Sequence, residues 1–473
     1  MKLKQTKMRV LFVYPNQTGQ VSCQLGIGYL SSILKEKGHI TGLFDATYLL
    51  YEPFKSITTK LFEKINKFKP DILAFSCRSL EFPFARRLAQ EIKKVYKIKI
   101  IFGGIHPTIQ PDEVLKCEAI DYICVGEAEK AFLEFVESFP SEKKINNIWT
   151  RERRTPLNPL IQDLDSIPFP DRDLFEIPEE KNNLIITSRG CPYNCSYCFN
   201  CILKKIYKGQ KYVRYRGVDN VIDEIRELLK HHKLDHFFIC DDLFTSNKER
   251  VISFCEKYKK EFKVPFTCNA RAGNIDKDIA RALKEANCIE VKMGIETGNE
   301  RLRKDVLKKY ITDDQIREAF KICKRAGLKT YANNMIGLPF ETEKTIKQTF
   351  ELNREVKPDA FQFSILCPFK GTDIYNTYKD NGYFSQKKQV LSYYDKSFAT
   401  FPNISERKLL TYQRFAYFYV KYPKFEPLIS SLRIFPLERI GIFNSKILAK
   451  LYASIRNRRG GNITVDVLAK KRK

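Results

Sequence analysis

The chain has 473 residues, a length that predicts roughly two or three domains and a large buried interior. No terminal stretch is typical of a signal peptide, and no run approaches the roughly 18 uncharged apolar residues of a membrane-spanning helix. The fourteen cysteines are therefore expected in a reducing cytoplasm, as metal ligands or buried apolar groups. The net charge of +27 is spread along the chain, mostly as lysine on helix-like segments, which favours a solvated basic surface over a nucleic-acid interface.

The N-terminal third alternates strand-like and helix-like stretches. In strand–helix pairs they are 9–14 and 26–37, 41–45 and 57–68, 72–77 and 84–96, 99–103 and 112–117, and 122–125 and 128–139. This alternation predicts an α/β fold with a doubly wound parallel sheet. Sheets of this kind bind ligands beyond the carboxyl ends of their strands, where glycines let a ligand approach the backbone.

Three of these strand ends carry residues that suit a ligand crevice. They are Phe75-Ser-Cys-Arg-Ser79, Phe102-Gly-Gly-Ile-His-Pro-Thr108 and Val125-Gly-Glu-Ala-Glu129. Taken alone, they predict only an α/β domain with a ligand crevice. The His-Pro turn at 106–107 is equally often plain loop structure.

Prolines and acidic residues then mark a linker. Between 151 and 180 the chain contains Pro156, Pro159, Pro168, Pro170 and Pro178. Proline disrupts helix interiors and central strands, so this stretch is expected to cross between domains. We place the linker at 146–181, after a first domain at 1–145 and before a second at 182–385.

Three cysteines follow the strand-like stretch 184–186. Cys191, Cys195 and Cys198 have C-x-x-x-C-x-x-C spacing on a short loop. Cubane clusters are normally held by four thiolates, so three would leave one iron open to a small molecule. Zinc is the alternative, but no second Cys or His pair follows at comparable spacing. Cys201 could supply a fourth thiolate; we treat it as a bystander.

The second domain resumes the alternation. Its strand-like stretches are 184–187, 236–240, 265–270, 289–293, 330–334 and 360–366. Helix-like stretches are 221–231, 250–262, 313–326 and 343–356. The polar landmarks at the strand ends are Asp241-Asp-Leu-Phe-Thr245, Arg271, Gly294-Ile-Glu-Thr-Gly298, Met335-Ile-Gly-Leu-Pro-Phe-Glu341 and Cys367-Pro-Phe-Lys-Gly-Thr372. Parallel barrels carry their chemistry at the carboxyl ends of their strands, where these residues lie.

The C-terminal region, 386–473, has a mixed basic and apolar pattern at helix-like spacing between 415 and 459. We expect a small helical region. The pattern favours helices that cap the second domain, and the alternative is contact with a membrane surface.

The cysteine loop resembles the cluster motif of the radical S-adenosylmethionine enzymes, and the three strand ends of the first domain resemble the cobalamin-binding domain fused to some of them. The resemblance covers roughly residues 8–385. It implies a 4Fe-4S cluster, S-adenosyl-L-methionine and cobalamin as cofactors, a Rossmann-like N-terminal sheet and a partial (β/α)6 barrel. The D-x-H-x-x-G motif that supplies a histidine to cobalt in other cobalamin proteins is absent, so the corrin is expected without a protein imidazole on cobalt.

The resemblance also implies roles for individual residues. The expected cluster ligands are Cys191, Cys195 and Cys198. The residues expected to bind S-adenosylmethionine are Tyr197 and Gly337 near the adenine, Asp241, Asp242 and Glu296 at the ammonium or hydroxyl groups, and Arg271 at the carboxylate. The residues expected at cobalamin are Ser76, Gly103, Gly104, His106, Gly126 and Glu127. No catalytic residue is assigned beyond the cluster.

The sequence therefore predicts a cobalamin-dependent radical S-adenosylmethionine enzyme that methylates an unactivated carbon of a small or lipid-like metabolite by way of a 5′-deoxyadenosyl radical. A reduced flavodoxin or ferredoxin-type protein would donate electrons, and no nucleic-acid partner is expected. Two alternatives stay open: a cobalamin-dependent radical cyclase or oxidoreductase without methyl transfer, and a non-catalytic iron–sulfur electron carrier or sensor in which Cys201 is a ligand.

Overall fold

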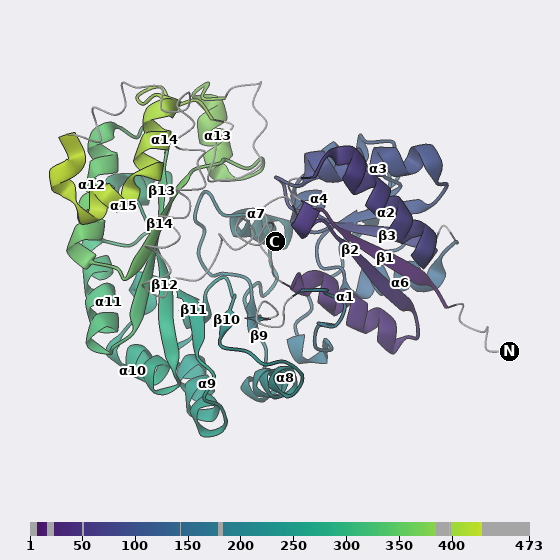
Figure 1. Ribbon diagram of the computed structural model, residues 1–473, viewed down its shortest axis with the longest axis horizontal. Helices are drawn as coiled ribbons and strands as arrows, with labels where there is room; N and C mark the ends of the chain where they lie inside the picture. Colours follow the sequence, from purple (N-terminus) through teal and green to yellow (C-terminus); the bar gives the residue numbers. More distant parts are fainter. Residues whose placement is uncertain are drawn as a thin grey trace, which may run out of the picture. The chain divides into compact units, whose positions relative to one another are not determined.

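The structure, a computed structural model, describes residues 7–16, 23–49, 52–141, 143–177, 183–384, 397 and 399–427 (Figure 1). The chain divides into two compact units. Unit 1 comprises Met1–Asn194, Cys198–Phe266 and Phe369–Thr372, and unit 2 comprises Cys195–Tyr197, Thr267–Pro368 and Asp373–Lys473. The domain boundaries expected at 145, 181 and 385 stay predictions.

The first sheet lies wholly in unit 1 and has the strand order β2-β1-β3-β4-β5-β6. Its strands are β1 (Arg9–Tyr14), β2 (Ile40–Asp45), β3 (Ile72–Ser76), β4 (Lys99–Gly103), β5 (Tyr122–Cys124) and β6 (Ile148–Trp149). The pairs that join β2, β1, β3, β4 and β5 are parallel, as predicted. The short edge strand β6, which the sequence did not predict, pairs with β5 in the antiparallel direction.

Helices cover both faces of this sheet. They are α1 (Leu25–Glu36), α2 (Phe54–Phe68), α3 (Phe82–Val95), α4 (Ile105–Ile109), α5 (Pro111–Leu115) and α6 (Glu129–Ser138). Successive residues of a strand point to opposite faces, and β1 shows the result: Val10 and Phe12 pack with α1 and α6, whereas Leu11 and Val13 pack with α2 and α3 (Figure 1). A doubly wound sheet with two buried faces is the predicted architecture.

The segment expected as a glycine-rich loop after β4 contains a short helix instead. Gly104 has a φ of 97°, a conformation that favours glycine, and α4 begins at the next residue. Pro107 lies in the first turn of α4, where its missing N–H group would have no partner in any case. The expectation of a loop was therefore wrong, because the chain enters a short helix directly after Gly104.

The linker packs against the first sheet of unit 1. Ile161, Leu164 and Ile167 join the apolar core that β1, α1 and α6 share. Asp171 accepts a hydrogen bond of 2.5 Å from Ser31 of α1. This proline-rich stretch is thus part of the packed unit and does not form a separate solvated tether.

The rest of unit 1 includes the elements before and after the cysteine loop in the chain. It contains β7 (Leu184–Ile185), β8 (Ser188–Arg189), α7 (Asn200–Ile206), β9 (Arg214–Tyr215), α8 (Val218–His231), β10 (Phe237–Ile239) and α9 (Lys248–Glu261). Strand β7 pairs with β10 in parallel, and β8 pairs with β9 in the antiparallel direction.

Unit 2 contains the strand order β14-β13-β12-β11. The strands are β11 (Phe266–Ala270), β12 (Cys288–Glu296), β13 (Lys329–Ile336) and β14 (Ala360–Ile365), and the helices before the C-terminal region are α10 (Lys277–Glu285), α11 (Asp313–Arg325), α12 (Glu343–Val356) and α13 (Asp373–Asp380). Thr312 and Thr342 begin α11 and α12 with capping boxes, which fixes where these helices start. The six expected barrel strands are β7, β10, β11, β12, β13 and β14.

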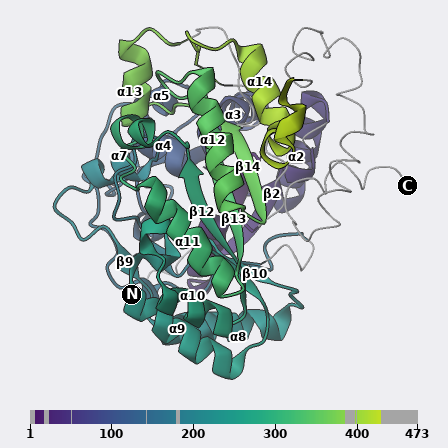
Figure 2. The ribbon, with the colours of Figure 1, turned by 90° about the vertical axis from the view of Figure 1, so that its left-hand side faces the viewer.

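Two further helices, α14 (Glu406–Arg414) and α15 (Ala416–Lys421), pack on the outer side of unit 2. Leu409 and Tyr419 are fully buried in a core with Phe350 of α12 and Ile365 of β14 (Figure 2). Within the described residues these helices therefore cap the sheet. The predicted basic and apolar pattern, which left capping and membrane contact open, also includes Leu428, Leu432, Phe435, Ile447, Leu451 and Ile455. These positions lie outside the described residues.

Among the described residues, no helix has the length and apolar character needed to cross a membrane.

Candidate iron–sulfur and cobalamin site

The three predicted cluster cysteines are half-buried on one loop, with Cys191 and Cys198 in unit 1 and Cys195 in unit 2. Within the described residues, no three Cys, His, Asp or Glu side chains are grouped as ligands of a single metal ion. Cysteines of a cubane bind different irons, so they need not converge on one ion. Cys201, in contrast, is only 3% exposed and packs among Ile109 and Ile202.

Lys204 of α7 holds the first half of the cysteine loop. Its Nζ donates to the carbonyl oxygens of Pro192 at 2.6 Å and Tyr193 at 3.1 Å, and to Asn194 Oδ1 at 2.9 Å. Gly190 has a φ of 87°, and a side chain there would collide with the Tyr212 carbonyl oxygen. The glycine and the lysine together set the path of the chain around Cys191.

Ser196 fixes the second half of the loop within unit 2. Its N–H donates to the Leu307 carbonyl oxygen at 2.9 Å, and its hydroxyl donates to the Val306 carbonyl oxygen at 2.7 Å. Its own carbonyl oxygen accepts from the Ile374 N–H at 3.0 Å. Three hydrogen bonds of Ser196 thus hold the chain directly after the predicted ligand Cys195, and Ser196 is 1% exposed.

Asn200 contacts the sulfur of Cys198. Its Nδ2 lies 3.5 Å from Cys198 Sγ, and its Oδ1 accepts a hydrogen bond of 2.5 Å from the Tyr212 hydroxyl. Asn200 also hydrogen-bonds to the carboxyl group of Asp242, one of the predicted cofactor contacts. An amide N–H at a ligand sulfur is one of the contacts that tune a cluster. Sequence reasoning missed Asn200, since no motif marks it.

Arg271, predicted at the carboxylate of S-adenosylmethionine, lies beside the second cysteine. It follows β11 and is 7% exposed. Its Nη2 donates to the Tyr310 carbonyl oxygen at 3.1 Å, and its Nη1 is 4.0 Å from Cys195 Sγ. The structure therefore places this guanidinium beside Cys195, a predicted cluster ligand, within unit 2.

Glu296 and Tyr197, predicted separately, are in direct contact. Glu296 ends β12 with a φ of 66°, an unusual conformation for glutamate. Its Oε1 accepts hydrogen bonds from the Tyr197 hydroxyl at 3.0 Å and from Lys309 Nζ at 2.6 Å. A side chain at Gly294 would collide with both Glu296 and Lys309, so glycine makes room for the pair. Lys309 was missed because it lies thirteen residues along the chain.

Gly337 lies in a turn that a buried acid organises. Its φ is 77°, its N–H donates to Glu341 Oε2 at 2.5 Å, and its carbonyl oxygen accepts from the Tyr378 hydroxyl. Glu341 also accepts from the Leu338 N–H at 3.1 Å. Burial raises the pKa of Glu341 to about 8, against the weaker lowering effect of these two backbone hydrogen bonds. Glu341 and Tyr378 were not predicted.

Asp241 is engaged by the strand before the cysteine loop. Its carboxylate accepts hydrogen bonds of 2.6 Å each from the Thr187 N–H, the Thr187 hydroxyl and the Ser188 hydroxyl. Arg250 also donates to the Thr187 hydroxyl at 3.1 Å. Asp241 is 1% exposed, and this burial raises its pKa. These hydrogen bonds join Asp241 to Thr187 and Ser188 within unit 1.

The predicted cobalamin residues lie at the carboxyl ends of β3, β4 and β5. Ser76 and Gly103 are register partners at the ends of β3 and β4. His106 in α4 is 4% exposed, its ring centroid is 4.4 Å from that of Phe82, and its Nδ1 is 3.1 Å from the Ser79 hydroxyl. Its Nε2 is buried without a hydrogen-bond partner, and burial lowers the pKa of His106 to about 4. The imidazole is therefore neutral at pH 7, and its buried Nε2 is available to hydrogen-bond to a polar group of a bound ligand.

Gly126 and Glu127 follow β5. Gly126 has a φ of 86°, and its N–H donates to the Thr108 hydroxyl at 3.0 Å. Glu127 does not project freely: it accepts from Arg214 Nη1 at 2.9 Å and from the Ile161 N–H at 2.9 Å. The structure thus ties this predicted cobalamin loop to its surroundings in unit 1.

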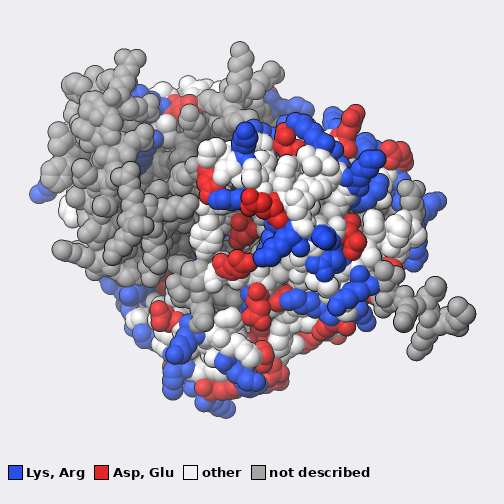
Figure 3. Space-filling view, turned by 45° about the vertical axis from the view of Figure 1, so that its right-hand side comes forward, with Lys and Arg blue, Asp and Glu red and all other residues white. Residues whose placement is uncertain are grey.

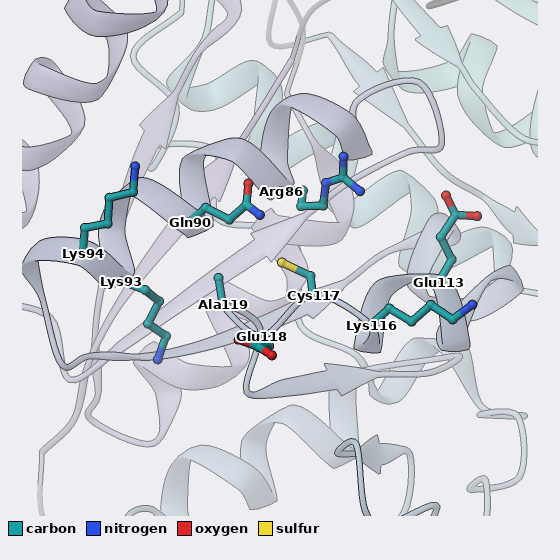
Figure 4. A pocket seen from close by; sticks show the side chains of 9 residues that line it. All are labelled: Arg86, Gln90, Lys93, Lys94, Glu113, Lys116, Cys117, Glu118 and Ala119. Atoms are coloured by element: carbon teal, nitrogen blue, oxygen red, sulfur yellow. The ribbon is translucent and has the colours of Figure 1, made fainter. Parts of the chain in front are cut away.

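A surface hollow of about 610 Å³ lies elsewhere on unit 1 (Figure 4). It is lined by Arg86, Gln90, Lys93, Lys94, Glu113, Lys116, Cys117, Glu118 and Ala119. Several of its charges are paired: Lys93 with Asp121 at 2.6 Å, and Glu113 with Lys370 at 2.6 Å. None of the predicted cofactor residues lines it.

The surface charge is mixed where it can be seen. On the face drawn in Figure 3, basic and acidic side chains are interspersed rather than gathered into one basic field. Exposed pairs such as Lys60 with Glu52 and Arg226 with Glu261 follow the same pattern. The lysine excess is thus distributed over the visible surface.

Comparison with known families identifies the class of protein. The family model of the Radical SAM superfamily matches residues 185–352, which include the cysteine loop. The model of the B12 binding domain matches residues 16–136, which include the three strand ends predicted to bind a ligand. A chain with both domains is a radical S-adenosylmethionine enzyme that carries a cobalamin domain, and its cofactors are a 4Fe-4S cluster, S-adenosylmethionine and cobalamin.

Individual relatives agree with this class. An anaerobic magnesium-protoporphyrin IX monomethyl ester cyclase of Rubrivivax gelatinosus is 31% identical over 79% of this chain and 70% of its own length. An uncharacterized methyltransferase of Pyrococcus horikoshii is 29% identical over 78% of this chain and 82% of its own length. The chain belongs to the cobalamin-dependent radical S-adenosylmethionine enzymes.

The fold is also found among solved structures. The radical S-adenosylmethionine methyltransferase TsrM of Kitasatospora setae, solved with cobalamin and a 4Fe-4S cluster, matches with a TM-score of 0.65 and 17% identity over 80% of this chain and 75% of that one. At this identity the likeness concerns the fold. It agrees with the predicted α/β class with an N-terminal Rossmann-like sheet.

Proposed function

We propose that this enzyme methylates an unactivated carbon of a small or lipid-like organic substrate. The observation that carries the proposal is the position of Cys201, which packs among isoleucines while the other three cysteines of the loop stay half-buried. Three ligands rather than four leave an iron available for S-adenosylmethionine. This supports an enzyme over an electron carrier with a fully ligated cluster.

Cys191, Cys195 and Cys198 would hold the cluster, and the residues around them fit such a group. When bound, the cluster supplies an electron that cleaves S-adenosylmethionine to a 5′-deoxyadenosyl radical, and cobalamin supplies a carrier for the methyl group. Asn200 and Arg271 place N–H groups at two of the three sulfurs. Donors at these positions suit thiolates that carry negative charge.

The contacts within unit 2 support roles toward S-adenosylmethionine. Lys309 and Tyr197 hold the Glu296 carboxylate, which leaves Glu296 Oε2 to accept from the ammonium or a ribose hydroxyl. Arg271 suits the carboxylate. Gly337, fixed by Glu341, would present its backbone to the adenine.

The aspartates of unit 1 divide into two roles. Asp241 already accepts three hydrogen bonds from Thr187 and Ser188, so its proposed role is to hold the strand that leads to Cys191. Asp242 is exposed and is the aspartate of the pair that we assign to the hydroxyl or ammonium groups of S-adenosylmethionine.

Cobalamin would sit on the carboxyl ends of β3, β4 and β5. Ser76, Gly103, Gly104 and Gly126 would line the approach, and the unsatisfied Nε2 of His106 would hydrogen-bond to the cofactor rather than bind cobalt. A reduced flavodoxin or ferredoxin-type protein is the proposed electron donor.

The second candidate is a radical cyclase without methyl transfer. It is favoured by relatives such as the Rubrivivax cyclase, which is 31% identical. The two candidates differ in the mass of the product, because only methylation adds the methyl group of S-adenosylmethionine to the substrate.

The test is anaerobic reconstitution with iron, sulfide and hydroxocobalamin, followed by gel filtration and a reductive assay. We expect about one corrin per chain, and 5′-deoxyadenosine from the wild type and Cys201→Ala but not from Cys198→Ala. Incubation of a small-molecule extract with methyl-deuterated S-adenosylmethionine should then yield a product labelled with deuterium. A new product without label would favour the cyclase. No 5′-deoxyadenosine from the wild type, together with an altered cluster spectrum in Cys201→Ala, would favour the electron carrier.

A further inference from the structure

Arg189 connects the cysteine loop to the predicted cobalamin loop. It lies on β8, two residues before Cys191. Its Nη1 is 3.2 Å from Glu127 Oε1, and its Nη2 is 2.6 Å from Glu129 Oε1. Glu127 follows Gly126 after β5, and Glu129 is the first residue of α6. One guanidinium thus bridges two carboxylates that lie about sixty residues earlier in the chain.

A second arginine strengthens the same connection. Arg214 of β9 is the register partner of Arg189, and its Nη1 is 2.8 Å from Glu127 Oε1. The same Nη1 donates to the Ile161 carbonyl oxygen at 2.8 Å. The Glu127 N–H donates to the hydroxyl of Tyr207, which follows α7, at 3.3 Å. Both strands of the β8–β9 ladder therefore contact the loop after β5, through the ion pairs of Arg189 and Arg214 with Glu127.

The location of these charges makes the connection rigid. The exposed fractions of the side chains are 21% for Arg189, 18% for Glu127, 11% for Glu129 and 4% for Arg214. Salt screens such partly buried pairs much less than exposed ones. Each arginine is also directional, because its planar guanidinium fixes the angle as well as the distance. Removing one partner would leave a poorly solvated charge without compensation.

We propose that Arg189 is a positioning residue that locks the loop 125–129 to the strand leading into Cys191. The proposal rests on the proposed function for what the two loops bind. It adds that the place of the corrin relative to the first cluster ligand is set inside unit 1 by the Arg189 ion pairs. The covalent linker 151–177 alone does not set it. Loosening Arg189 changes the spacing of the two cofactors while each stays bound.

The test compares Arg189→Gln with the wild type in the reconstituted full chain. Pulsed electron paramagnetic resonance measures the spin–spin interaction between the cob(II)alamin cobalt and the reduced cluster. We expect a single narrow distance distribution in the wild type and a broader or shifted one in Arg189→Gln, with corrin and iron content unchanged. An identical distribution in the variant would overturn the proposal.

Hydrogen exchange gives a second readout that does not depend on the cofactors. In Arg189→Gln, the amides of 125–129 and of 188–191 should exchange roughly tenfold faster and together, as expected when one charged contact is lost. Faster exchange at 188–191 alone, or at neither segment, would overturn the proposal. If the wild type binds no corrin, the proposed function fails. The exchange comparison still tests whether the Arg189 ion pairs hold the loop 125–129 to the strand before Cys191.

Two further variants complete the test, the first as a control and the second as a milder change at the same ion pairs. Arg226→Gln removes an exposed arginine of α8 that also bridges two carboxylates, those of Asp223 and Glu261, and should leave both readouts unchanged. Glu129→Gln retains the pair between Arg189 and Glu127 and is the milder variant if Arg189→Gln folds poorly. It should give the same changes as Arg189→Gln to a smaller degree, and wild-type behaviour in both readouts would count against the proposal.

Discussion

At the scale of single residues, Asn200 is the contact that bears most directly on cluster chemistry. Its amide N–H faces Cys198 Sγ, and the Tyr212 hydroxyl holds the other end of the amide. A hydrogen bond to a ligand sulfur stabilises the reduced, more negative cluster and so raises its reduction potential.

The first prediction concerns this hydrogen bond. Asn200→Asp keeps an acceptor for Tyr212 but replaces the N–H donor at Cys198 with a carboxylate oxygen, so the reduction potential of the cluster should fall. Redox titration followed by electron paramagnetic resonance measures it. Asn146→Asp, an amide-to-acid change at an exposed position of unit 1, is the control and should leave the potential unchanged. A potential in Asn200→Asp equal to that of the wild type would show that the contact does not tune the cluster.

A second residue-scale prediction follows from Glu341. Its pKa of about 8 is above the ordinary value of 4.5, so the folded state holds its proton more tightly than the unfolded state. The stability that this proton contributes is present below about pH 4.5 and is lost as the pH rises toward and through 8. Glu341→Gln retains an acceptor oxygen for Gly337 and Leu338 but cannot ionise.

The variant should therefore lose less stability than the wild type between pH 5.5 and pH 8. We expect the difference in melting temperature between these two pH values to be smaller in Glu341→Gln by about 2–5 °C. Thermal unfolding of matched, reconstituted samples measures it. Parallel pH profiles for the two proteins would mean that Glu341 does not titrate in this range.

At the scale of secondary-structure elements, α7 acts as a brace for the cysteine loop. Lys204 projects from this helix to three oxygen acceptors in 192–194. Lys204→Met keeps the length of the side chain and removes the donors, so the first half of the loop should open more often. Iron release to a chelator should then be roughly tenfold faster. Lys205→Met, a change at the neighbouring exposed lysine of α7, is the control, and equal release rates in the two variants would contradict this role.

Element boundaries were predicted well where a local pattern decides them. The helix at 343–356 was expected between the same residues, because its capping threonine and apolar periodicity are local. In contrast, β12 runs on through Gly294 to Glu296, and the sequence placed its end at Met293. Glycine in the sequence indicated a loop there, but a register shift in the pairing with β13 accommodates it.

At the scale of the whole molecule, the chain contains two compact units, each with buried apolar residues. Leu61 of α2 is buried in unit 1, and Leu409 of α14 is buried in unit 2, both with no exposed surface. Truncating a fully buried leucine to alanine costs about 2–5 kcal/mol.

We therefore expect the two truncations to act on different thermal transitions. Leu409→Ala should lower the transition of unit 2 by about 4 °C or more and leave that of unit 1 in place, and Leu61→Ala should do the reverse. Differential scanning calorimetry measures both. A single transition lowered equally by both variants would show that the units unfold as one cooperative body.

The candidate site was predictable only in part. The cysteine loop and the strand-end residues Arg271, Glu296 and Gly337 were singled out from the sequence, because carboxyl ends of parallel strands gather functional residues. Their roles toward the cofactors stay predictions. Of the residues that hold this loop and these strand ends, Asn200 and Lys309 carry no motif, and Glu341 ends a predicted strand-end landmark but was given no role of its own. Lys309 reaches Glu296 across thirteen residues, and only the folded chain brings these two side chains together.

The sequence by itself determined the α/β class, the alternation of strands and helices and the three-cysteine loop, because these depend on local spacing and residue type. The cofactor set followed from the resemblance of its motifs to a known family. Only the tertiary structure decided which cysteine is withdrawn into an apolar cluster, which carboxylates are already engaged and which arginines connect the two ligand loops. The physical reason is that burial and ion pairing depend on neighbours distant in sequence: Arg189 and Glu127 lie 62 residues apart and yet form a direct ion pair.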